Sequence, residues 1–410
     1  MFLALKEMKK DKGRFLLIIS IVVLISYLVF FLTGLAYGLA KDNTSAVETW
    51  NANKVVLKSG TNANIFSSMM DADSVEDFTD EEFSPINIAR SVAYLNGSES
   101  NENTIDLVLI GLHQESIAYP EIIEGDMPKT QDEVLASVSL RDEDGVEIGD
   151  TLVLSMNDRE FKVTGFTEEA KYNVSSVIYT DLEMASASMM VFIPEEERDE
   201  MREEEDPSTQ PIDGGDEAKA GVSEEETPSE SQEGEQTPPD AVSSATPGVP
   251  ERIAGILIHG ENNVASDNGY DVLNIDKFIQ EIPGYIAQVL TFGLMIGFLI
   301  LISTIVLGVF MYIITMQKKQ TFGIMKVQGI SNSYIAKSVI IQTFLVSLFG
   351  ALIGLALTYI SEYFLPYTVP FKSNILFYAI IAGLIIVISL VGAIFSVKGV
   401  SKVDPLEVLD

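Results

Sequence analysis

The chain has 410 residues, of which 47% are hydrophobic, and a formal net charge of −34. It contains no cysteine and only two histidines, which excludes disulfides, thiolate metal sites and a histidine-rich metal centre. We expect His113 and His259 to be surface or edge residues. We also expect no intrinsic cofactor, no bound metal and no nucleic-acid partner.

Four apolar segments long enough to cross a bilayer are unevenly distributed along the chain. One lies near the start and three lie in the last third, at residues 15–40, 285–316, 338–362 and 373–397. This pattern predicts a membrane α-helical protein with four transmembrane helices, one plus three. Residues 41–284 then form a domain inserted between helices 1 and 2. Helix 2 is longer than the bilayer core is thick, so we expect its outer end to rise as a stalk.

Basic residues indicate the orientation of these helices. They crowd residues 1–14 and recur in the connection 317–337 and in the tail 398–410. The positive-inside rule places these three segments in the cytoplasm, so both termini are cytoplasmic and residues 41–284 are extracellular. A cleaved signal peptide is the competing interpretation, but the first apolar segment is too long for one and no Ala-x-Ala-like site follows Leu39.

Acidic residues concentrate between about 195 and 250, among Pro, Ser, Thr, Gly and Gln. Such a composition cannot bury enough apolar surface to offset chain entropy, so it predicts a disordered extracellular loop. A Ca²⁺ site is the alternative, but the segment lacks an Asp-x-Asp-x-Asp-Gly loop.

The remainder of the inserted segment predicts a mixed α/β extracellular domain. Alternating apolar residues indicate strands at 104–111, 151–155, 160–166, 175–179 and 255–259. Helices are expected at 181–190, where Asp181 can cap the first turn, and at 275–282, and turns are expected at 142–145 and 149–150.

Catalytic motifs are missing from the sequence. It has no phosphate-binding Gly-x-x-x-x-Gly-Lys-Ser/Thr loop, no Gly-x-Ser-x-Gly elbow and no His-Glu-x-x-His pair. The interiors of the apolar segments also lack the ionisable residues that ion-coupled transporters use. We therefore expect a non-catalytic protein, and any transport should be driven by a separate partner.

Glycine spacing suggests where helices meet. Gly34 and Gly38 form a Gly-x-x-x-Gly pattern in the outer part of helix 1, and residues 293–297 and 350–354 repeat it. Such patterns allow close helix packing in membranes. We expect Gly34 and Gly38 to form a homodimer contact, although packing within one subunit explains the pattern equally well.

The one-plus-three arrangement, residues 3–10, the loop 321–330 and the tail 403–408 resemble the FtsX-like permeases of the MacB type. The resemblance covers the chain except the acidic loop. The family's pattern Gly-x-x-Lys/Arg-x-x-Gly is matched by Gly323, Lys326 and Gly329, while Phe322 departs from the more polar residue common before the first glycine. The resemblance implies that this loop docks on a cytoplasmic ABC ATPase subunit, which carries ATP and Mg²⁺. Ile324 and Met325 would supply the apolar contact.

Within this family, residues 26–40, the following residues 42–45, and residues 369–371 look like haem-exporter permeases of the HrtB type. That likeness implies a homodimeric permease in the cell membrane of a Gram-positive bacterium, in contact with lipid, that extracts haem as its transported substrate. A porphyrin needs aromatic walls and an axial ligand, which suggests Tyr37, Glu48, Trp50 and Tyr172 as haem contacts. Tyr37 and Trp50 equally fit an interfacial aromatic belt, and Glu48 fits a solvated face.

Two other functions remain open from the sequence. One is export of antimicrobial peptides or lipophilic drugs. The other is a non-transporting, FtsX-like signal transmitter, which needs no aromatic cavity for a substrate.

Overall fold

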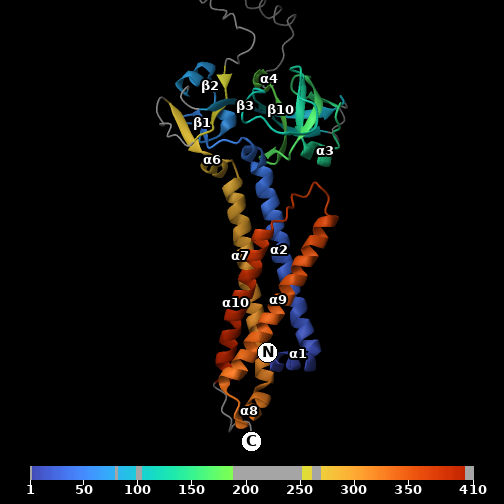
Figure 1. Cartoon of the computed structure of the whole chain (residues 1–410), viewed down its shortest axis with the longest axis vertical. Coiled ribbons are helices and arrows are strands. Elements are labelled where there is room, and N and C mark those ends of the chain that lie inside the picture. Colours follow the sequence, from blue (N-terminus) through green and yellow to red (C-terminus); the bar gives the residue numbers. More distant parts are fainter. Residues whose placement is uncertain (1, 79–81, 98–103, 188–251, 261–268, 402–410) are drawn as a thin grey trace, which may run out of the picture.

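The computed structural model describes residues 2–78, 82–97, 104–187, 252–260 and 269–401. The acidic loop expected at about 195–250 and the tail from residue 402 onward lie outside the described residues. Figure 1 shows an elongated helical bundle that carries a β-rich domain at one end.

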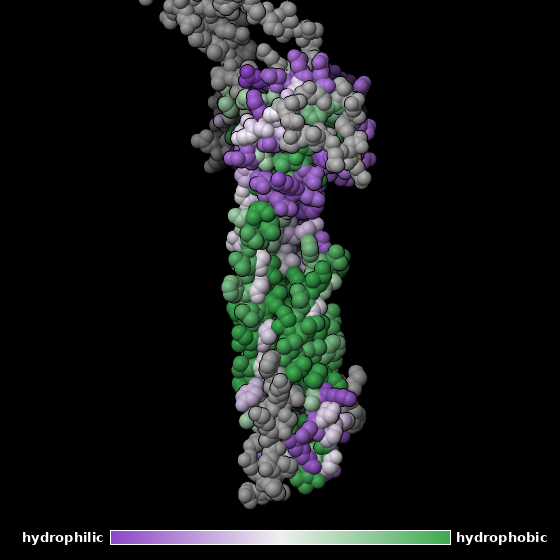
Figure 2. Space-filling view, turned by 90° about the vertical axis from the view of Figure 1, so that its left-hand side faces the viewer, coloured by the Kyte–Doolittle hydropathy of each residue, from purple (hydrophilic) through white to green (hydrophobic). Residues whose placement is uncertain are grey.

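Four helices of the described chain are long and apolar enough to cross a membrane. They are α2 (Lys12–Thr49), α7 (Tyr285–Gln317), α9 (Asn332–Phe364) and α10 (Ile375–Ser401), preceded by the short helix α1 (Phe2–Lys10). Figure 2 shows their continuous hydrophobic belt beneath the hydrophilic domain. The predicted one-plus-three arrangement is confirmed.

The stalk contains two helices, whereas the sequence analysis expected only helix 2 to rise above the membrane. Helix α2 has 38 residues and runs without a break into the exterior domain beside α7 (Figure 1). At 1.5 Å per residue it is about 57 Å long, well beyond the thickness of the hydrocarbon core. Polar residues in its last three turns, from Lys41 onward, ended the apolar pattern but did not end the helix.

Helix α9 packs closely against α2 through small and hydroxyl-bearing residues. A Cβ at Gly354 would lie 2.8 Å from the backbone nitrogen of Tyr27, so only glycine allows this approach. The buried hydroxyls of Thr343, Ser347 and Thr358 donate to carbonyls four residues earlier in α9. The seam therefore combines near contact of the two backbones with internally satisfied polar groups, as expected in lipid.

The exterior domain is built on a large mixed sheet with the strand order β13-β1-β12-β3-β4-β10-β6-β8-β5. Its strands are β1 (Lys54–Lys58), β3 (Phe83–Leu95), β4 (Thr104–Gly111), β5 (Ile122–Gly125), β6 (Glu133–Ser137), β7 (Thr151–Leu154), β8 (Glu160–Thr167), β9 (Lys171–Tyr172), β10 (Ser175–Thr180), β12 (Gly255–Ile258) and β13 (Tyr270–Asn274), with β2 (Met70–Asp71) and β11 (Arg252–Ile253) forming a small second sheet. The helices are α3 (Val138–Asp144), α4 (Leu182–Ala187) and α6 (Ile275–Glu281), with short 3₁₀ turns at Ile65–Ser67 and Ala72–Phe78.

Strand β3 joins the two halves of this sheet. Its first residues pair with β12 and its remaining residues pair with β4, both antiparallel. The five expected strands are confirmed as β4, β7, β8, β10 and β12, to within one residue at each end. The expected turn at 142–145 is instead the end of helix α3, which stops at Gly145 in the left-handed conformation with φ of 72°.

One hydrophobic core of the exterior domain contains Trp50, the residue that follows α2. Trp50 is 0% exposed; its ring stacks on Tyr172 with centroids 6.4 Å apart and lies 5.8 Å from the ring of Phe278. Helix α2 therefore ends inside the domain core, and the domain and the helix form one packed unit.

We predict that Trp50→Ala destabilises the exterior domain by about 3–5 kcal/mol, because it removes a large buried ring from a close-packed core. Trp50→Phe should cost less, since it keeps an aromatic ring. Thermal unfolding and limited proteolysis of the detergent-solubilised protein measure both changes. A Trp50→Ala variant that stays as stable as wild type would contradict this core role.

Described residues on the two sides of the segment 188–251 are held close together. The Asn87 side chain donates to the carbonyl of Leu182 at 2.9 Å and to that of Arg252 at 3.3 Å. We predict that a Gly-Ser linker of about ten residues in place of 190–249 keeps the domain folded. The shorter loop should stabilise it by about 1–2 kcal/mol through a lower closure entropy. Loss of the folded domain on this replacement, seen in the same unfolding assay, would show that the segment has a structural role.

Candidate functional site

Three buried polar residues mark the outer end of α2, where it meets the exterior domain. Asp42, Asn43 and Thr44 are 2–3% exposed, although they follow a long apolar helix. The side chain of Asn43 donates to the carbonyl of Leu39 and to Oε1 of Gln288 on α7, at 2.8 and 2.9 Å. Asn43 thus joins the two stalk helices to each other.

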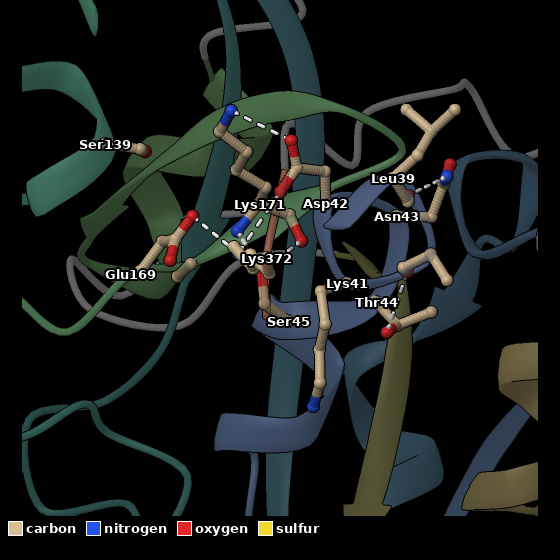
Figure 3. A network of polar contacts seen from close by, with 12 residues as sticks. Leu39, Lys41, Asp42, Asn43, Thr44, Ser45, Ser139, Glu169, Lys171 and Lys372 are labelled. Carbon is tan, nitrogen blue, oxygen red and sulfur yellow. Dashed lines mark hydrogen bonds and ion pairs between the residues drawn. The ribbon is translucent and has the colours of Figure 1, made fainter. Parts of the chain in front are cut away.

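Asp42 is the centre of an alternating chain of charges (Figure 3). Its two carboxylate oxygens each lie 3.3 Å from a lysine Nζ, one from Lys171 on β9 and one from Lys372 in the connection between α9 and α10. Lys171 also contacts Glu143 of α3 at 2.5 Å, and Lys372 contacts Glu169 at 2.7 Å. One carboxylate therefore connects α2, the exterior domain and the α9–α10 connection.

The chain of charges is asymmetrically buried. The side chains of Asp42 and Lys171 are 4% and 5% exposed, whereas that of Lys372 is 27% exposed. Burial alone would lower the pKa of Lys171, but its hydrogen bond to Glu143 and the charge of Asp42 hold that pKa above its ordinary value. Lys171 therefore stays charged, and removal of its partners would leave a buried cation unpaired, which is strongly destabilising.

The turn between β9 and β10 reinforces this contact through the backbone. The N–H groups of Asn173 and Val174 donate to the carbonyls of Asn43 and Asp42, at 3.1 and 2.9 Å. Val174 has a φ of 75°, a left-handed conformation that is unfavourable for a β-branched residue. The strained turn persists because both of its N–H groups find carbonyls of α2.

The connection between α9 and α10 covers the outer half of α2. Phe371 occupies the space where a side chain at Gly34 would lie, and the backbone of Pro370 does so at Gly38. The N–H of Lys372 donates to the carbonyl of Gly34 at 3.2 Å. Both glycines therefore pack against a segment of their own subunit, which is the alternative explanation of the Gly-x-x-x-Gly pattern. The homodimer contact through Gly34 and Gly38 stays a prediction.

Between this connection and the exterior domain lies a cavity of about 340 Å³. It is lined by apolar and aromatic residues of the connection and by polar residues of α2, α3 and the β8–β9 turn, among them Asp42, Ser139, Glu169, Tyr367, Phe371 and Lys372. Figure 3 shows Glu169 joined to Lys372.

The structure separates the four expected haem contacts. Trp50 and Tyr172 are core residues, 0% and 1% exposed, so neither can touch a ligand in this conformation. Their aromatic and amphipathic character does not by itself distinguish a binding wall from a core. Tyr37 and Glu48 remain accessible in part on α2.

Tyr37 and Glu48 are linked by Lys41, which the sequence analysis did not single out. Lys41 forms an ion pair with Glu48, and its Nζ lies 6.0 Å from the centre of the Tyr37 ring. Thr44 donates to the other carboxylate oxygen of Glu48 at 3.0 Å. The spacing of four, three and four residues places all of these side chains on one helix face, a signal visible in the sequence.

At the opposite end of the bundle, the expected coupling loop is largely a helix, α8 (Lys319–Val327). Gly323 lies within this helix, and Gly329 ends the turn that follows with a φ of 87°. Ile324 and Val327 are 54% and 57% exposed, whereas Met325 packs against the cluster around Phe322. The accessible apolar pair is therefore Ile324 and Val327 rather than Ile324 and Met325, with Lys326 half-buried between them.

Lys318 joins α8 to the start of the chain. Its Nζ lies 3.6 Å from a carboxylate oxygen of Glu7 and 3.2 Å from one of Asp11. Glu7 also accepts a hydrogen bond from Gln342 of α9 at 2.5 Å. The first residues of α8 are thus held against α1, α2 and α9.

Comparisons with known proteins agree with this arrangement. Residues 293–405 match the family of FtsX-like permease C-terminal domains. The whole chain is 25% identical to a protein named "Putative hemin transport system permease protein HrtB" from Staphylococcus haemolyticus, over 99% of that protein. It is 24% identical to the protein of the same name from Staphylococcus epidermidis, again over 99% of it.

Two solved structures align with part of the chain. The periplasmic region of MacB from Actinobacillus actinomycetemcomitans aligns at 10% identity with a TM-score of 0.31, covering 59% of this chain and 97% of that one. The extracellular domain of the ABC-type transporter YknZ aligns at 10% identity with a TM-score of 0.25, covering 33% of this chain and 77% of that one. From the family match, the chain contains an FtsX-like permease domain, which comprises most of its last three membrane helices and α8.

Proposed function

We propose that this chain is the permease of an ABC exporter that removes haem from the outer part of the cell membrane and releases it outside. A separate cytoplasmic ATPase, with its own ATP and Mg²⁺, supplies the energy, and two copies of the permease act together. The observation that carries this proposal is the similarity, over the full length, to proteins named as hemin transport permeases.

The accessible face of α2 supports haem as the substrate. A porphyrin has flat apolar rings, two propionates and an iron that needs an axial ligand. On that face Tyr37 offers an aromatic ring, Lys41 a cation for a propionate, and Glu48 or the Tyr37 hydroxyl an oxygen for the iron. Tyr37 also packs edge-on against Phe377 of α10, with ring centroids 5.4 Å apart, which extends the aromatic wall.

Energy from the ATPase reaches this face through continuous helices. Ile324 and Val327 would insert into a groove of the ATPase, and α8 continues directly from α7 through Lys318. A tilt of α8 then moves α7, and Lys318 passes the movement to Glu7 of α1 and to Asp11 at the base of α2. Because α2 runs unbroken to the exterior domain, its outer end moves with its base.

We predict that Ile324→Asp reduces permease-stimulated ATP hydrolysis more than about tenfold. A charge would replace an exposed apolar anchor, and loss of such an anchor costs about 2 kcal/mol or more. The measurement is ATP turnover of the ATPase with and without the purified permease.

Two control variants make this test specific. Gln328→Asp changes a neighbouring exposed position and should leave stimulation unchanged. Met325→Asp should lower the thermal stability of the permease itself, because Met325 faces the bundle. Normal stimulation by Ile324→Asp would show that the ATPase binds elsewhere.

We predict that Tyr37→Ala combined with Glu48→Ala weakens haem binding by about tenfold or more, since each lost polar contact is worth about 1–1.5 kcal/mol. Haemin titration of the purified permease, followed by the porphyrin Soret band, measures this. The growth of cells on toxic haemin measures the consequence for export. Thermal unfolding checks that the variant remains folded.

The matched control is Lys162→Gln, an exposed position on β8 far along the chain from this face. Unchanged haem affinity in the double variant places the site elsewhere. If the wild-type complex binds no haem at all, a search with lipophilic drugs and cationic peptides tests the alternative export function.

A further inference from the structure

The α9–α10 connection, residues 365–374, is named the strap here. It has little internal structure: the N–H of Val369 donates to the carbonyl of Pro366, and that of Phe371 donates to the carbonyl of Val369. Its backbone meets α2 through the N–H of Lys372 and the carbonyl of Gly34. The strap is thus attached to α2 by one backbone hydrogen bond and by packing contacts.

The strap fills a groove in α2. Gly34 and Gly38 lack side chains, and the ring of Phe371 and the backbone of Pro370 occupy the free space. Phe371 also packs on Phe31 with ring centroids 5.2 Å apart. The groove lies within the apolar helix, so it would face the outer part of the membrane if the strap moved away.

The ionic contacts of the strap are the ones that can separate at low cost. If Lys372 moves, Asp42 keeps Lys171 as a partner, and Lys372 enters water, where its side chain is already 27% exposed. Partly exposed ion pairs contribute little net stability. Separation of Asp42 from Lys171 would instead leave two buried charges with fewer partners, which is strongly unfavourable in free energy.

A cavity lies on the side of the strap that faces the exterior domain, and exposed aromatic side chains lie where the strap leaves α9. The cavity of about 340 Å³ separates the strap from α3 of the exterior domain. At the end of α9 and in the strap, Tyr363, Phe364 and Tyr367 are 86%, 77% and 76% exposed. Exposed aromatic side chains at the end of a transmembrane helix sit at the membrane–water interface. The strap can therefore move toward the domain while its base stays at the membrane surface.

We propose that the strap is a lid over the Gly34–Gly38 groove, that the contact between Lys372 and Asp42 is its latch, and that its opening exposes the groove to an amphipathic molecule in the outer leaflet. The choice of cargo rests on the proposed export of haem, but the movement of the lid does not. Asp42 stays joined to the exterior domain through Lys171, so α2 and the domain remain one unit while the lid opens.

A reversible cross-link tests the movement. The chain has no cysteine, so Phe31→Cys on α2 combined with Phe371→Cys on the strap introduces the only two thiols and leaves Lys372 in place. A short bis-methanethiosulfonate reagent can bridge them because the centroids of the two native rings lie 5.2 Å apart. In the complex with its ATPase, we expect efficient bridging without nucleotide and at least severalfold less when the complex is trapped with ATP and vanadate. Equal bridging in both states would overturn the proposal.

The bridged complex then tests the function of the lid. We expect export and permease-stimulated ATP turnover to fall severalfold, and both to return when a reductant opens the bridge. Each single-cysteine variant treated with the same reagent is the control. Full export by the bridged complex would also overturn the proposal. The bridging yield could depend on the nucleotide state while the wild-type complex exports no haem. That result would support the lid movement and contradict haem as the cargo.

Hydrogen exchange tests the latch without any activity. Lys372→Gln should speed exchange of the amide hydrogens of residues 371–374 severalfold, and Lys372→Arg should restore most of the protection. Lys162→Gln is the matched control on the exposed surface. Unchanged exchange in Lys372→Gln would show that the ion pair does not hold the strap.

Discussion

The buried carboxylate of Asp42 is shared by two lysines that come from opposite parts of the chain. Lys171 belongs to the exterior domain and Lys372 to the connection between the last two membrane helices. Because a buried charge must keep a partner, the outer end of α2 cannot move independently of both neighbours. The position of the domain above the bundle depends on this interaction and on the N–H groups of Asn173 and Val174 that bind the same turn of α2.

Helix α2 connects that interaction to the other end of the bundle. It runs from the turn beside Asp11, at the end of the bundle that carries α8, to Trp50 in the core of the exterior domain. A helix has no soft joint unless its hydrogen bonding is interrupted, and α2 has neither proline nor a bulge. Lys318 at its base and Asp42 near its top therefore act on two ends of one stiff element. This arrangement suits a protein that transmits a movement from one end of the helical bundle to the domain at the other end.

Much of this architecture could be predicted from the sequence, because membrane helices and half-buried strands have clear periodic signals. The four apolar segments and the five alternating strands were correctly predicted. The other strands were missed: β1, β3, β5, β6 and β13, and the two-residue strands β2, β9 and β11. Short strands such as Lys54–Lys58 carry too little alternation to stand out. The long central strand β3 was missed because it contains Pro85 and is buried continuously over Ile86–Ala89 instead of alternating.

The candidate site was harder to predict than the fold. Trp50 is as compatible with a ligand wall as with a core, and Gly34 and Gly38 fit a partner helix as well as their own subunit's strap. Asp42 was hidden for another reason: a single acidic residue beyond an apolar segment normally marks the end of a helix. Only the positions of Lys171 and Lys372, both distant in sequence, show that its charge is buried and paired.

The sheet order also has a consequence for synthesis of the protein. Strand β1 follows α2 directly, yet both of its neighbours, β12 and β13, lie after the long acidic segment. On a ribosome that makes the chain from its amino end, β1 has no strand to pair with until residues 255–274 are outside the membrane. Those residues immediately precede α6 and α7. The sheet of the exterior domain is therefore completed at about the time when α7 is inserted. Until then β1 has unpaired edges. An unpaired strand can pair with another chain, so we expect a chaperone or slow folding of β1 to protect it.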